Sequence, residues 1–298
     1  MFRIFFILFV SILFFSACKK ETIEREVKED LVIEGNIPPP SGSIPAIKIE
    51  NYINRVYIDM LGITPSEQQM ESHKIFLAEN EYSKTARETV INEVLSNPLF
   101  YRRYHERNSF NMLEGIDSAT IAENILIFGF VYQNAIDNGE ILEAQFIQLE
   151  IDRMQKLLDA REDFAQGEIN VNNYYRRLIN NFFYDEINMG SENFAIATFE
   201  NFFLRLPTSS ELNRSVEMID GSPEQLFQVS GSGKGDFMNI VTQSQEFHSG
   251  LVSRIYNFLL IRNPTAVEIN TNATILEQDR NIKDLFVTIL ISEEYASF

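Results

Sequence analysis

The chain has 298 residues and a formal net charge of −18, with 43 acidic and 25 basic residues. Such a charge repels nucleic-acid phosphates and anionic lipid head groups, so nucleic-acid binding is not expected. One cysteine excludes a disulfide framework within the chain. Apolar residues make up 45% of the sequence, and 25 Phe and 11 Tyr without Trp predict aromatic-rich packing. Only 13 Gly and 9 Pro favour helices over a β-rich or fibrous fold.

The N-terminal segment has the pattern of an export signal. Arg3 precedes an apolar run, Ile4 to Phe15, that is too short to span a bilayer comfortably. The following residues, Phe15-Ser16-Ala17-Cys18, resemble the bacterial lipobox, with Phe15 in place of the usual Leu. The resemblance implies cleavage after Ala17, lipid on the Cys18 thiol and acylation of its new amine. An ordinary secretory signal with a chance cysteine is the alternative.

Residues 18–46 are expected to form a flexible tether behind a signal peptide of residues 1–17. The tether is charged at first and then rich in turn formers, including Pro38-Pro39-Pro40, and would span roughly 30 Å as a coil. Lys19, not Asp, follows the cysteine, so the inner-membrane retention signal of proteobacteria is absent. We therefore expect a lipid anchor in the outer membrane, periplasmic or surface-exposed. Lys20 followed by acids loosely resembles the surface-export signal of Bacteroidota lipoproteins.

The body contains an internal repeat. A shift of 199 residues places the segment from Arg55 to Ser66 on the segment from Arg254 to Thr265, and a third copy, Phe199 to Thr208, aligns with the latter at a shift of 57. The matched residues of the motif are Arg55, Tyr57 and Pro65, then Arg254, Tyr256 and Pro264, with Pro207 in the third copy. We assign helical modules to residues 47–115, 193–250 and 251–298, around a central helical segment, 116–192.

Each copy predicts a helix, a proline corner and a second, capped helix. Proline lacks the amide hydrogen that would continue the first helix. The capping boxes that should start the second helix are Ser66 with Gln69, Thr208 with Glu211, and Thr265 with Glu268. A closing phrase then follows an apolar stretch in each module: Ser96 to Phe100, Ser244 to Phe247, and Ser292 to Tyr295. The predicted fold is all-α, a multi-helix array of three such modules and a central insertion, in which the motif residues are structural and not binding residues.

The repeated phrase resembles two bacterial domain types. Arg55, Tyr57, Asp59, Leu61, Gly62 and Pro65 resemble a helical domain of uncharacterised function that accompanies cytochrome-c-like modules in planctomycete proteins. Tyr256, Leu259, Leu260, Arg262, Pro264, Ser292 and Tyr295 resemble a repeat of bacterial surface proteins and phycobilisome linkers. Neither resemblance implies a catalytic activity, and the second implies helical interaction modules.

The central segment is predicted to contain three helices, over Ile121 to Ile136, Ile141 to Phe164 and Asn172 to Ile187, with Gly139 in the first turn. The run Phe128 to Tyr132 is apolar enough for a membrane, but polar residues bound it closely. We interpret it as part of a buried helix.

The sequence contains one concentrated basic and aromatic patch, whose candidate partner-binding residues are Tyr101, Arg102, Arg103, Tyr104 and Arg107. Tyr and Arg form strong contacts in interfaces, so the patch could bind an acidic partner or a glycan. The favoured interpretation is the polar face of a helix, paired with local acids.

No catalytic residue, metal ligand or cofactor is predicted. His73, His105 and His248 lack the i+3 or i+4 partners of a helical zinc site, so surface or packing roles are expected. The run Gly231 to Asp236 lacks the spacing of a phosphate-binding loop and no strand is predicted before it, so a flexible loop is expected.

These observations predict a non-enzymatic envelope lipoprotein that serves as an interaction or assembly module with a protein partner. The alternative is an accessory subunit of an envelope secretion, nutrient-uptake or glycan-binding complex, and a hydrolase of unrecognised type is less favoured.

Overall fold

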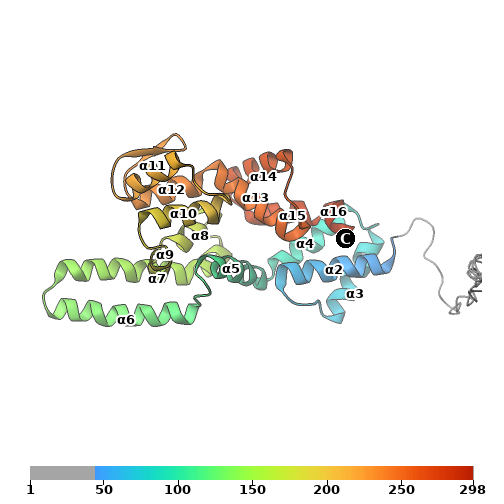
Figure 1. The fold of residues 1–298 in the computed structure, drawn as a ribbon. Coiled ribbons are helices and arrows are strands. Elements are labelled where there is room, and N and C mark those ends of the chain that lie inside the picture. Colours follow the sequence, from blue (N-terminus) through green and yellow to red (C-terminus); the bar gives the residue numbers. More distant parts are fainter. Residues whose placement is uncertain (1–43, 298) are drawn as a thin grey trace, which may run out of the picture. The chain divides into compact units, whose positions relative to one another are not determined.

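The computed structural model describes residues 44–297, and these residues fold as an all-α array (Figure 1). The predicted signal peptide, Cys18 and most of the predicted tether lie outside the described residues. The helices are α2 (Ala46–Leu61), α3 (Glu67–Glu79), α4 (Lys84–Ser96), α5 (Pro98–Met112), α6 (Ser118–Asp137), α7 (Ile141–Gln166), α8 (Val171–Ile179), α9 (Phe182–Ile187), α10 (Ser191–Phe203), α11 (Ser209–Ile219), α12 (Lys234–Gln243), α13 (Gln245–Leu260), α14 (Ala266–Asp279), α15 (Ile282–Leu290) and α16 (Glu293–Ala296). A short antiparallel hairpin, β1 (Glu224–Leu226) and β2 (Val229–Gly231), lies between α11 and α12.

The helix that opens each module ends in the same way. Gly62, Leu204 and Ile261 adopt the left-handed conformation, with φ of 72°, 57° and 55°. The proline follows three residues later, at Pro65, Pro207 and Pro264. Glycine adopts this conformation freely, whereas Leu and the β-branched Ile strain it. The corner is therefore relaxed in the first module and strained in the other two.

The three predicted capping boxes are all present. In each, the side chain of Ser66, Thr208 or Thr265 accepts from a backbone N–H in the first turn of α3, α11 or α14, and the side chain three residues on accepts from the cap's own N–H. These reciprocal bonds satisfy two amides that a helix start would otherwise leave unpaired.

The closing phrases are helix starts as well. Asn97, Ser244 and Ser292 cap the N-termini of α5, α13 and α16 with their side chains. The helix that closes the second module, α13, is also the helix that opens the third, since it carries both Phe247 and Tyr256. The boundary that we assigned between residues 250 and 251 lies inside this helix.

Neighbouring modules are joined by an arginine. It lies on the opening helix of one module and donates to a carbonyl at the C-terminal end of the opening helix of another. Arg254 of α13 donates to the Asn201 carbonyl in the last turn of α10, and Arg55 of α2 donates to the Leu259 carbonyl in the last turn of α13. A cation at a helix C-terminus satisfies carbonyls that lack an amide partner. The second module thus adjoins the third, and the third adjoins the first.

The central segment differs from prediction at its C-terminal end. Helices α6 and α7 form the expected antiparallel hairpin, which turns at Gly139 with φ of 77° (Figure 1). The single helix predicted from Asn172 to Ile187 is wrong, because the chain breaks there into α8 and α9. The Asn181 side chain accepts from the Tyr184 amide at 3.0 Å and so starts a new helix.

The prediction that the run Phe128 to Tyr132 is buried is also wrong in part. Of the residues in α6, only Ile121 and Ala135 are buried. Phe128 is half-buried and packs on Phe182, with ring centroids 5.0 Å apart, but Phe130 is 77% exposed. Helix α6 packs mainly along α7, so its opposite side faces solvent.

The core is rich in aromatic rings, as the composition predicted. Tyr104, Phe164, Tyr174, Tyr175 and Phe247 form a chain of ring contacts that joins α5, α7, α8 and α13. Such edge and offset contacts add to the free energy of burying each ring. This cluster fixes α5 and α7 against α8 and α13.

Candidate functional site

The basic and aromatic patch of residues 101–107 lies on α5, and the helix divides it between the core and the surface. Tyr104 is 5% exposed, and its hydroxyl lies 3.0 Å from that of Tyr175. Tyr101 is half-buried, with its ring centroid 5.4 Å from that of Phe164. Burial raises the pKa of both tyrosines in the patch. These two rings therefore pack inward and do not offer a contact surface together.

The three arginines of the patch are also separated. Arg107 donates to the Asp59 carbonyl at 3.3 Å and covers the Phe258 ring at 3.6 Å, so it joins α5 to α2 and α13. Arg102 is exposed and Arg103 is half-buried, and both pair with Glu106, at 3.5 Å and 3.1 Å. The outward part of the patch is thus a polar helix face paired with a local acid.

The motif tyrosines form equivalent internal hydrogen bonds. The Tyr57 hydroxyl lies 3.0 Å from His73 Nε2, and Asn272 Nδ2 donates to the Tyr256 hydroxyl at 3.3 Å. His73 and Asn272 are themselves 199 residues apart, the shift of the repeat. The second module has Phe199 and Ser215 at these positions, and the buried Ser215 hydroxyl has no hydrogen-bond partner among the described residues.

Two arginines that the sequence analysis did not single out organise the corners. Arg205 pairs with Glu211 at 2.7 Å and with Glu246 at 2.5 Å, and Arg262 pairs with its counterpart acids, Glu268 and Glu294, at 2.8 Å and 2.6 Å. The two arginines are separated by the repeat shift of 57, and so are Glu211 and Glu268. This spacing is the feature of the sequence from which the paired arginines could have been predicted. The hydrogen bonds from Arg205 lower the pKa of Glu211 to about 2. Each arginine ties a capping box to the closing helix of its module.

The histidines pack within the fold, and the described residues contain no cluster of His, Cys, Asp and Glu that could hold a metal ion. His73 and His248 are 4% and 1% exposed. His248 Nε2 lies 3.3 Å from Asn172 Oδ1, and burial lowers the pKa of His248 to about 4.

The glycine-rich run Gly231 to Asp236 is a tight connection and not a free loop. The prediction that no strand precedes it is wrong, because β2 ends at Gly231. Asp236 accepts from the Ser232 amide at 2.8 Å, and Lys234 forms an ion pair with Asp185 of α9. The ammonium group is therefore occupied within the protein.

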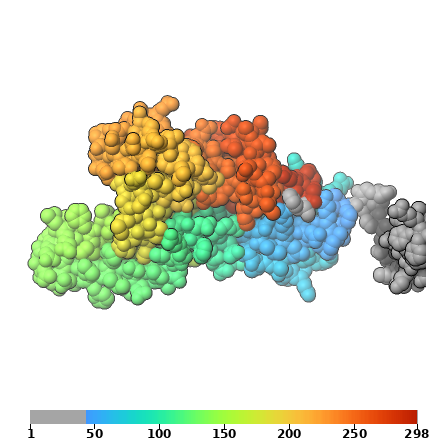
Figure 2. Space-filling view, in the orientation of Figure 1, coloured from blue at the N-terminus to red at the C-terminus, as the bar shows by residue number. Residues whose placement is uncertain are grey.

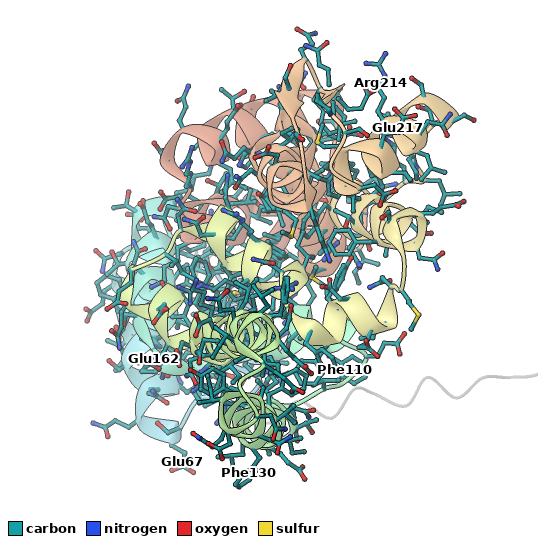
Figure 3. The ribbon with its side chains drawn as sticks, turned by 90° about the vertical axis from the view of Figure 1, so that its left-hand side faces the viewer. Glu67, Phe110, Phe130, Glu162, Arg214 and Glu217 are labelled. Carbon is teal, nitrogen blue, oxygen red and sulfur yellow. The ribbon has the colours of Figure 1, made fainter. Side chains whose placement is uncertain are left out.

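A pocket of about 400 Å³ lies between α5, the start of α6 and α7, and we call it the α5–α7 pocket. Its polar lining includes Arg102, His105 and Arg161, and its apolar lining includes Phe110 and Ile121. The Phe110 ring, labelled in Figure 3, lies over Gly115, where an added Cβ would be 3.4 Å from it. The volume lies within the range of small-molecule sites.

A second surface of note is the outer side of α6. Leu126, Ile127, Phe130 and Val131 are 66%, 48%, 77% and 45% exposed, and we call these four residues the α6 face. Their spacing places them on one side of the helix. Figure 3 shows Phe130 at the lower edge of the view, pointing away from the other helices, and the green surface of Figure 2 belongs to the α6–α7 hairpin.

Comparison with known proteins finds no match: no protein-family model, no curated protein and no solved structure is similar to this chain. Among the described helices, none combines the length and apolar character needed to cross a membrane.

Proposed function

We propose that this chain is a non-enzymatic lipoprotein of the cell envelope whose helical body serves as an interaction module. The α6 face is the observation that carries the proposal. It is a run of large apolar side chains in water, and burying such surface against a partner is favourable by about 25 cal/mol per Å². Contiguous apolar patches on monomers commonly mark interaction sites.

The charges around this face define the partner. No Asp, Glu, Lys or Arg lies between Glu123 and Asp137, so the face itself is neutral. Residues 118–152 nevertheless contain six acidic residues and no Lys or Arg; the acids are Glu123, Asp137, Glu140, Glu143, Glu150 and Asp152. A second copy would place the two acidic rims against each other, and anionic lipid would be repelled in the same way. The partner that fits is a protein with an apolar contact surface bordered by Lys or Arg.

Photo-crosslinking in intact cells tests this proposal. A photoreactive amino acid replaces Phe130 in one variant and Val267, a 74% exposed residue of α14, in the control. We expect position 130 alone to form a discrete adduct with another protein, and a Leu126→Glu change in the same chain to abolish it. Adducts with lipid alone, with a second copy alone, or of equal yield at position 267 would contradict the proposal.

The membrane anchor is the second part of the proposal and rests on the lipobox residues. Two or three acyl chains at Cys18 would give stable membrane attachment, whereas a single chain would be marginal. We expect the Cys18→Ser variant to leave the membrane fraction, and mass spectrometry of the unchanged protein to find fatty acid on its N-terminal peptide. Retention of the variant in membranes, with no lipid on the unchanged chain, would overturn the anchor without affecting the α6 face.

A further inference from the structure

We propose that the α5–α7 pocket binds a small carboxylate whose apolar body lies against Phe110 and Ile121. The site is separate from the α6 face and from the interaction that we propose there. The polar lining combines the donors of Arg161, His105 and Arg102 with two carboxylates, Glu106 and Asp117. Glu106 pairs with Arg102 and Arg103, and Asp117 accepts from the Thr120 amide at 2.8 Å, so both acids already have partners within the protein. The donors are the groups that remain available to a ligand.

Arg161 of α7 supplies the first donor. Its side chain is exposed and forms no ion pair or hydrogen bond with any residue from 44 to 297. Acidic residues greatly outnumber basic ones in this chain, yet none of those described pairs with Arg161. Its guanidinium has the planar fork that binds a carboxylate through two parallel hydrogen bonds. An unpaired arginine at the edge of an apolar pocket is a fitting group for an anionic ligand.

His105 of α5 supplies the second donor, and its tautomer follows from Tyr174. The Tyr174 hydroxyl is buried at 3.1 Å from His105 Nδ1. Burial raises the pKa of Tyr174 well above its ordinary value, so the hydroxyl keeps its proton. His105 Nδ1 is its one hydrogen-bond partner among residues 44–297, so donation to Nδ1 is the arrangement that leaves no buried hydroxyl proton unpaired. A neutral imidazole that accepts at Nδ1 carries its own proton on Nε2. The ring therefore offers an Nε2–H donor to the pocket that it lines.

Arg102 extends the donor set. Its Nε lies 3.5 Å from Glu106, but the side chain is 51% exposed, so most of its donors remain free. The apolar wall consists of the Phe110 ring, which is 66% exposed, and of Ile121, which is buried at the base of α6. Free donors and an aromatic ring in one pocket match a ligand with a carboxylate head and an apolar body.

Titration calorimetry of the full chain with three probes tests the proposal. Benzoate carries both features, benzamide has the same ring without the charge, and inorganic phosphate has charge without the ring. We expect benzoate to bind at least tenfold more tightly than either of the other probes, since a hydrogen bond to a charged group and ring burial are each worth about that factor. Equal binding of benzamide or of phosphate, or no binding of benzoate, would overturn the proposal.

Matched variants localise the binding. Arg161→Gln removes the unpaired guanidinium and should weaken benzoate binding roughly tenfold. Arg214→Gln, on α11 in Figure 3, makes the same change of charge far along the chain and should leave binding unchanged. Phe110→Ala should weaken binding through loss of the apolar wall. A Leu126→Glu change should not alter benzoate affinity, so failure of the α6 face and failure of this pocket are distinguishable. Equal loss in the Arg214 and Arg161 variants would contradict the proposed site.

Discussion

The Tyr295 hydroxyl donates a hydrogen bond to the Asp59 carboxylate at 2.8 Å, so the last helix of the array holds the first. Arg55 lies over the same ring, 4.1 Å from its centroid. Nearby, Tyr52 donates to the Leu290 carbonyl at 3.2 Å, and Tyr82 donates to the Ala296 carbonyl at 3.2 Å. Three tyrosine hydroxyls thus join residues that are more than 200 positions apart.

We expect a Tyr295→Phe substitution to lower the free energy of unfolding by about 2 kcal/mol, because a hydrogen bond to a charged group is lost while the ring packing remains. Urea unfolding followed by circular dichroism measures this change. Tyr132→Phe is the control, since the hydroxyl of Tyr132 has no hydrogen-bond partner among residues 44–297. A similar effect of both changes would mean that the contact between α2 and α16 contributes no stability.

Two substitutions at the corners, one to glycine and one from glycine, should change the stability of the protein in opposite directions. Ile261 is 80% exposed at φ 55°, so Ile261→Gly should relieve strain and raise stability by about 1 kcal/mol. Gly62→Ala should lower stability by at least about 1 kcal/mol. At Gly62, φ is 72° and an added Cβ would lie 2.4 Å from Arg103 Nε. Thermal unfolding of the two variants checks both directions, and a destabilised Ile261→Gly would contradict the assignment of strain.

The buried Ser215 hydroxyl predicts a stabilising substitution in the second module. An unpaired buried hydroxyl costs about 1–3 kcal/mol, so Ser215→Ala should raise the free energy of unfolding by about 1 kcal/mol. The control is Ser109→Ala, since Ser109 donates to the His105 carbonyl at 2.8 Å and its removal should be neutral or destabilising. Equilibrium denaturation compares them, and a loss of stability in the Ser215 variant would show that its hydroxyl is satisfied.

Stability should fall in mild acid, partly through His248. Its folded-state pKa is about 4, below the value of about 6.5 expected for an unfolded chain, so the unfolded state binds more protons between these values. The contribution of the neutral ring is complete above pH 6.5 and is lost progressively as the pH falls toward 4. From pH 7 to pH 5 we expect a loss of about 2 kcal/mol from this residue.

The His248→Gln variant isolates that contribution. Glutamine has no proton to gain, so the difference between urea midpoints at pH 7 and pH 5 should be smaller than in the unchanged protein. His105 also has a folded pKa of about 4 and remains in both proteins, so some acid sensitivity should persist. Equal pH dependence of the two proteins would contradict the burial effect at His248.

The sequence predicted the fold class and the corners because those signals are local. Each corner consists of a proline, a capping serine or threonine, and the cap's partner three residues further on. These residues lie within about one helical turn, so the hydrogen bonds of the cap form whatever the helix packs against. The closing phrases were recognised as repeated, but their role as helix caps appears only with the structure. The shared helix α13 was missed because the two motifs that it carries were assigned to separate modules.

Features that depend on tertiary contacts could not be predicted in this way. Helix α6 is apolar on several sides, so its periodicity does not tell which side faces solvent. The pairing of Arg205 with Glu246 joins residues 41 positions apart. The sequence indicated it only through the repeat, which places Arg205 at the same position as Arg262. The α5–α7 pocket combines residues from three helices, of which the sequence analysis had singled out Arg102 for binding and His105 for packing alone.

The succession of the modules has a consequence for how such a protein can evolve. Linear repeat arrays grow by copying a unit, because each end of the stack can accept another. Here the first module occupies the place that a fourth would take beside the third, through Arg55 at the end of α13 and Tyr295 on Asp59. A further copy that stacked on the third module in the same way would have to displace the first module, so these contacts limit how many modules can stack in this manner.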